Sequence, residues 1–122
     1  MKSDFIANSI AVHLLDPMVK DSAFMLAISP TKADSKNLLC DVMNFIGKTP
    51  ECAVVNDDYI LYGEKVVRFI SANSNLMKGF CPDYVFLLES SKFTQEQMER
   101  IYPMRFNAIV IESHGTIFDI ET

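Results

Sequence analysis

The sequence predicts an α/β fold in which helices cover both faces of a mainly parallel sheet. A continuous apolar run, Tyr84–Leu88, is typical of a strand that is buried on both faces of such a sheet. Helical and strand-like patterns alternate along the rest of the chain, as they do in α/β proteins. The 122 residues, of which 49% are hydrophobic and 22% charged, suffice for one compact domain that spans residues 1–122.

A helix and a strand are predicted at the start of the chain. Ser3 can cap a helix whose apolar residues recur at helical spacing as far as Asp16-Pro17. His13 lies near the apolar face of this helix, where we expect it to be a packing residue. Residues 24–28 then form an apolar run of strand length.

The second helix carries the clearest amphipathic pattern in the sequence. Thr31 or Asp34 can cap its beginning, and Gly47 is a natural residue just past its end. Its apolar stripe comprises Leu38, Leu39, Val42, Met43 and Ile46. We expect this stripe to pack on the sheet that carries Val85 and Leu87.

A β-hairpin is predicted in the middle of the chain. Its strands are Tyr59–Tyr62 and 66–70, joined through Gly63-Glu64-Lys65 and preceded by a polar turn, Asn56-Asp57-Asp58. We interpret Asp57 and Asp58 as turn residues and expect no metal site, because no further acids follow at a known loop spacing. Residues 71–78 are small and polar and indicate a loop.

The last third contains a short helix and two further strands. Thr94 can cap a helix over residues 95–102, and Gln97 stands where a glutamine completes a capping box. An apolar strand is predicted at 108–111. A final strand at 116–121 is placed to fold back and pair antiparallel with it.

Charge and cysteine content limit the classes of protein to consider. A net charge of −5 argues against a protein that coats nucleic acid non-specifically. Cys40, Cys52 and Cys81 have no zinc-site spacing, and we expect reduced thiols, with Cys40 in the core. No apolar stretch reaches the roughly 18 residues of a membrane span, and no signal peptide is evident. We therefore expect a cytoplasmic protein without membrane contacts.

Several short motifs occur in an order that is known from one family. They are Met1-Lys2-Ser3, Ser29-Pro30-Thr31-Lys32, Lys78-Gly79, the apolar strand that ends at Glu89, and Ile109-Val110-Ile111-Glu112-Ser113. In this order they resemble the ATPase core of viral large terminases and, more distantly, RecA-like helicases. The resemblance implies a three-layer RecA-like core with an inserted β-hairpin and, here, a C-terminal antiparallel strand. A viral protein would work in the host cytoplasm or nucleus.

The resemblance also implies roles for individual residues. Lys2 and Ser3 would end a phosphate-binding loop, and Glu89 would be the catalytic base that activates water. Thr31, Lys32 and Lys78 would contact phosphates of a nucleotide or nucleic acid. Each residue also has a structural interpretation: an ordinary helix start for Lys2 and Ser3, a helix cap for Thr31, a solvated Lys32 and a strand end for Glu89.

Three departures from the family pattern argue against catalysis. No glycine-rich turn and no strand precede Lys2, although a phosphate cradle needs both. Leu88 stands where the family has the aspartate that holds magnesium, and Lys78 stands where it has arginine. We therefore expect a non-catalytic binding or regulatory module that requires no cofactor and holds no metal.

Two other functions stay open on the sequence alone. The chain could be a DNA-packaging ATPase subunit that binds ATP and magnesium once a partner completes the site. It could also be a small nucleic-acid-binding protein that uses Thr31, Lys32 and Lys78. Strand 108–111 would in any case present an open edge, which either 116–121 or a second copy could cover.

Overall fold

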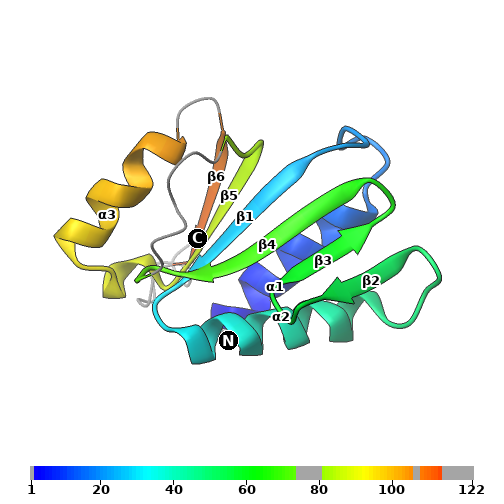
Figure 1. Ribbon diagram of the computed structural model, residues 1–122, viewed down its shortest axis with the longest axis horizontal. Coiled ribbons are helices and arrows are strands. Elements are labelled where there is room, and N and C mark those ends of the chain that lie inside the picture. Colours follow the sequence, from blue (N-terminus) through cyan, green and yellow to red (C-terminus); the bar gives the residue numbers. More distant parts are fainter. Residues whose placement is uncertain (1, 74–80, 106–107, 114–122) are drawn as a thin grey trace, which may run out of the picture.

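The structure is a computed structural model that describes residues 2–73, 81–105 and 108–113. Six strands form one sheet in the order β2-β3-β4-β1-β5-β6 (Figure 1). The strands are β1 (Phe24–Ser29), β2 (Cys52–Val55), β3 (Tyr59–Tyr62), β4 (Lys65–Ser71), β5 (Tyr84–Leu88) and β6 (Ile109–Ser113). The helices are α1 (Lys2–Leu15), α2 (Lys32–Ile46) and α3 (Gln95–Ile101), with 3-10 turns η2 (Ser90–Lys92) and η3 (Tyr102–Arg105).

The sheet confirms the predicted α/β class and the predicted hairpin. Strands β4, β1, β5 and β6 are parallel, and β2, β3 and β4 form an antiparallel meander at the other side. Strand β2 was not predicted, and it lies at the edge of the sheet with Val54 and Val55 exposed. The predicted final strand at 116–121 lies outside the described residues.

Two apolar clusters fill the spaces on either side of the sheet. Helices α1 and α2 cover one face and α3 covers the other (Figure 1). The α2 stripe shares its cluster with Phe86 and Leu88 of β5. The stripe thus packs on the predicted sheet, whereas the side chains of Val85 and Leu87 lie on its opposite face, toward α3. Since both faces of β5 are apolar, the sequence pattern did not distinguish them.

Local signals set most of the helix ends. Thr31 caps α2 by accepting a hydrogen bond from the backbone N–H of Asp34 at 3.1 Å, and Gly47 ends α2 with a φ of +77°. Thr94 and Gln97 form the predicted capping box at the start of α3. The prediction that Ser3 precedes the first helix is wrong, because α1 already includes Lys2.

Two other expectations about single residues have opposite outcomes. His13 packs edge-on against the rings of Tyr84 and Phe86, and its Nδ1 lies 2.7 Å from the Ser9 carbonyl oxygen, which confirms the packing interpretation. Cys40 is exposed, so the prediction that it lies in the core is wrong. It follows the buried Leu39 directly, and one residue turns the helix far enough to leave the buried stripe.

Polar side chains form hydrogen bonds at the amino ends of the parallel strands. The ammonium of Lys65, which is only 7% exposed, donates to the carbonyls of His13, Leu14 and Asp16 at 2.9 to 3.2 Å and so caps the end of α1. Asp83 accepts the backbone N–H of Phe24 at 2.9 Å and the Lys20 ammonium at 3.1 Å. These contacts join segments that lie far apart in the sequence.

No helix in the described part of the chain has the length and the apolar character that crossing a bilayer requires.

Candidate functional site

The carboxyl ends of the four parallel strands lie along one edge of the sheet, where α/β proteins place their sites. In the pairing register Ser29 at the end of β1 lies beside Ser71 of β4, and Leu88 of β5 lies beside Ser113 of β6. Glu89 directly follows Leu88. The edge therefore brings hydroxyl and carboxylate residues from strands distant in sequence close together.

Glu89 has an unusual backbone conformation and an engaged side chain. Its φ of 51° and ψ of 53° lie in the left-handed region, which is costly for a residue with a Cβ. Its carboxylate, with the side chain 18% exposed, forms an ion pair with the Lys92 ammonium at 2.9 Å. The hydrogen bond and the charge of Glu89 raise the pKa of Lys92. The carboxylate of Glu89 is therefore engaged by a neighbouring side chain and does not lie free at the edge of the sheet.

Leu88 belongs to the apolar core and takes no part in polar chemistry. Only 4% of its surface is exposed, and it packs in the cluster under α1 and α2. The described residues contain no group of three side chains that could hold a metal ion. The side chain that precedes Glu89 therefore presents methyl groups and no oxygen that could bind a metal ion.

Ser29 belongs to the motif Ser29-Pro30-Thr31-Lys32 but was given no role of its own, although it lies at the same edge. It is completely buried, and within the described part of the chain its hydroxyl has no hydrogen-bond partner. A buried hydroxyl without a partner is uncommon and costs free energy. A serine at the end of an otherwise apolar strand was the one available signal.

The other predicted site residues are spread over different surroundings. Lys2 and Ser3 lie in the first turn of α1, Lys32 lies exposed in the first turn of α2, and Lys78 lies outside the described residues. The hydroxyl of Thr31 caps α2. Beside Glu89, the hydroxyl of Ser90 donates to a carboxylate oxygen of Glu112 at 3.1 Å.

One tripeptide matches the end of a phosphate-loop pattern but has the wrong structural context. Gly47-Lys48-Thr49 follows the carboxyl end of α2, and the backbone N–H of Gly47 donates to Met43. A phosphate loop instead leads into the amino end of a helix, whose N–H groups face the phosphate. This tripeptide therefore forms a helix cap.

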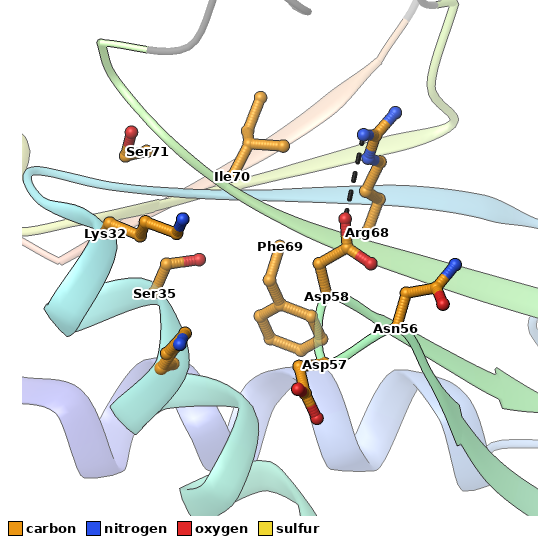
Figure 2. A pocket seen from close by; sticks show the side chains of 10 residues that line it. Lys32, Ser35, Asn56, Asp57, Asp58, Arg68, Phe69, Ile70 and Ser71 are labelled. Carbon is orange, nitrogen blue, oxygen red and sulfur yellow. Dashed lines mark ion pairs between the residues drawn. The ribbon is translucent and has the colours of Figure 1, made fainter.

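An open groove with a volume of about 430 Å³ lies between the start of α2 and the turn that joins β2 to β3 (Figure 2). Its lining residues are Lys32, Ser35, Lys36, Asn56, Asp57, Asp58, Arg68, Phe69, Ile70 and Ser71. Asn56 and Asp57 both have positive φ, which bends the predicted turn sharply. The Asp58 carboxylate lies 3.7 Å from the Arg68 guanidinium, which stacks over the Tyr59 ring.

These features define a three-layer α/β protein whose polar groups gather at the carboxyl edge of a mostly parallel sheet. No family model matches the sequence, and no curated protein matches it either. The fold is similar to the crystal structure of the HK97 bacteriophage large terminase, with a TM-score of 0.73 and 15% sequence identity. The match covers 93% of this chain and 26% of the terminase, so the chain spans about a quarter of that protein's length. The fold is thus terminase-like, as the sequence motifs indicated.

Proposed function

We propose that this chain is a terminase-related ATPase core that does not hydrolyse ATP by itself and acts as a binding or regulatory module. Its setting would be viral or virus-derived, in the cytoplasm or nucleus of a host cell. The observation that carries the proposal is Leu88, a buried apolar residue at the position where the family places its magnesium ligand. Without metal and phosphate contacts, the charge that develops in phosphoryl transfer is not neutralised.

Two further observations support the loss of catalysis. Glu89 is paired with Lys92 at 2.9 Å, so its carboxylate is engaged before any water could be positioned. The sequence has four glycines, and none belongs to a complete phosphate-loop pattern. The fold thus supplies a binding scaffold, while the chain supplies few of the groups that the chemistry needs.

An ATPase assay of the purified chain with Mg²⁺ and ATP tests this proposal. We expect no turnover above that of a buffer blank. Glu89→Gln and the exposed matched variant Glu99→Gln should both leave this blank rate unchanged. Turnover that Glu89→Gln abolishes and Glu99→Gln does not would show that the chain is a catalyst.

A second candidate is a nucleotide site that a partner chain completes. Within the described residues β6 is the last strand of the sheet and pairs with β5, and Ile109 is 58% exposed. Phe5, Val12 and Leu15 of α1, the helix that packs on β5 and β6, are also exposed. A strand added beside β6 would cover the edge and could bring a phosphate loop to the start of α1.

Mass measurements in solution, without and with Mg-ATP, examine this second candidate. A second copy joined through β6 would double the mass, because two-fold pairing continues the sheet. Replacing Val110 by proline should remove such pairing, since proline lacks the N–H group that an added strand requires. A monomer that binds no nucleotide alone or with candidate partner chains would exclude this candidate and leave the first one standing.

A further inference from the structure

The groove beside α2 concentrates positive charge on one wall. Lys32 and Lys36 lie one turn apart on α2, and both line the groove. The amino end of this 15-residue helix adds the partial positive charge of its aligned peptide dipoles. Figure 2 shows the Lys32 side chain extending toward the groove. This wall therefore favours an anionic group.

Ser35 provides a second and independent sign of a ligand. It lines the groove and is only 6% exposed, and within the described residues its hydroxyl forms no hydrogen bond. In Figure 2 the hydroxyl points from α2 into the groove. The hydroxyl oxygen is not among the fully buried polar atoms that lack a partner, so it reaches the solvent of the groove and is placed to bond a group that enters there.

The opposite wall carries an acceptor rather than a donor. One carboxylate oxygen of Asp58 faces Arg68, whereas the other, Oδ1, is buried and has no hydrogen-bond partner among the described residues. A carboxylate oxygen can only accept, so a hydroxyl or an amine of a ligand is the kind of group that could donate to it. A ligand that fits both walls would therefore carry an anionic group at one end and a hydrogen-bond donor at the other.

We propose that this groove binds a small phosphate monoester that carries neighbouring hydroxyl groups, such as a sugar phosphate. The phosphoryl group lies at the start of α2 against Lys32, Ser35 and Lys36, and a ligand hydroxyl donates to Asp58 Oδ1. The volume of about 430 Å³ is within the range of sites for small molecules. The carboxylates of Asp57 and Asp58 repel a longer polyanion, which favours a small ligand over a nucleic acid strand.

Titration of the ¹⁵N-labelled chain, followed by amide chemical shifts, tests this assignment. The probes are ribose 5-phosphate, inorganic phosphate, ribose and a short single-stranded DNA. We expect ribose 5-phosphate to give saturable shifts at the start of α2 and at residues 56–58, and to bind more tightly than phosphate or ribose. Ser35→Ala should weaken its binding by about fivefold to tenfold, as the loss of one typical hydrogen bond does.

Two matched lysine variants complete the test, since both residues are exposed and neither supports the core. Lys36→Ala should weaken binding of ribose 5-phosphate, whereas Lys48→Ala, past the far end of α2, should not change it. The proposal is overturned by any of four results: no saturable shifts, equal affinity for inorganic phosphate, tighter binding of the DNA at the same residues, or unchanged affinity in Ser35→Ala. Folding of each variant is verified from its own amide spectrum.

Discussion

The two ends of the parallel strands differ in how their polar groups are satisfied. At the amino ends, Lys65 donates to three carbonyls at the end of α1, and Asp83 accepts from Phe24 and Lys20. At the carboxyl ends, Ser29 has a buried hydroxyl without a partner in the described part of the chain, and Glu89 has a left-handed backbone. Strain and unmet hydrogen bonds persist where the surrounding structure is stable enough to impose them. The contacts at the amino ends therefore stabilise the fold, whereas the strained backbone and the unpartnered hydroxyl at the carboxyl ends lower its stability.

The largest effect should come from Lys65→Met, which tests the amino-end part of this contrast. The change keeps the length of the side chain but leaves the three carbonyls at the end of α1, those of His13, Leu14 and Asp16, without their donor. We expect the free energy of unfolding to fall by roughly 3 kcal/mol, because unmet buried acceptors and lost charged hydrogen bonds both contribute. Urea denaturation measures it, with the exposed Lys36→Met as control. A loss under about 0.5 kcal/mol, as at surface sites, would contradict this role for Lys65.

A smaller effect that depends on pH should come from Asp83. The hydrogen bond from the Phe24 N–H, aided by Lys20 and opposed by burial, lowers the pKa of Asp83 in the folded chain. Its stabilising contribution is therefore complete above the unfolded pKa of about 3.9 and is lost as pH falls through the lower folded pKa. Asp83→Asn should cost about 1 kcal/mol at neutral pH, because the side chain is 36% exposed and solvent screens the ion pair.

The pH profile provides the check on Asp83. Between neutral pH and acid, the stability of the wild-type chain and that of Asp83→Asn should converge. A constant difference across that range would mean that the titration of Asp83 does not contribute to folding.

A pair of variants isolates the strain at Glu89. Both Glu89→Ala and Glu89→Gly remove the ion pair with Lys92, but only glycine adopts the left-handed conformation readily. The glycine variant should be more stable than the alanine variant by about 1 kcal/mol, as thermal denaturation of the two can show. If alanine proves the more stable, the backbone at this position is not under strain.

The smallest expected effect is a gain in stability at Ser29. Ser29→Ala removes a buried hydroxyl that has no partner among the described residues, so we expect unfolding to require up to about 1 kcal/mol more. Ser90→Ala serves as a contrast, because that hydroxyl donates to Glu112 and its loss should destabilise the chain. Equal losses in both variants would remove the distinction between them.

The sequence predicted those parts of the fold that depend on neighbouring residues. The capping box of Thr94 and Gln97 and the cap of Thr31 are local signals, and all three residues act as expected. The short edge strand β2 was not predicted because it has only four residues, three of them exposed, and so shows little pattern. Lys65 contacts residues that are 49 to 52 positions away in the sequence, and a local sequence pattern does not predict such contacts.

The candidate site was predicted only in part, for a similar reason. The position of Glu89 at the end of a central strand followed from the apolar run before it. The groove is lined by residues of α2, of β4 and of the turn at Asn56. These segments come together only when the sheet forms, so the sequence alone did not group them into one site. Nothing in the sequence around Ser35 distinguishes it from other serines in the first turn of a helix.

The central position of β1 also has a consequence for how quickly the chain folds. Strands β2, β3 and β4 can form from local hairpins, whereas β1 must find β4 and β5, and the bond between Phe24 and Asp83 spans 59 residues. Closing such long loops lowers the entropy of the chain before the stabilising contacts form, and this slows folding. The meander can therefore assemble early, and insertion of β1 is then the late step. If so, changes at the Asp83 contact act mainly on the unfolding rate and leave the folding rate nearly unchanged.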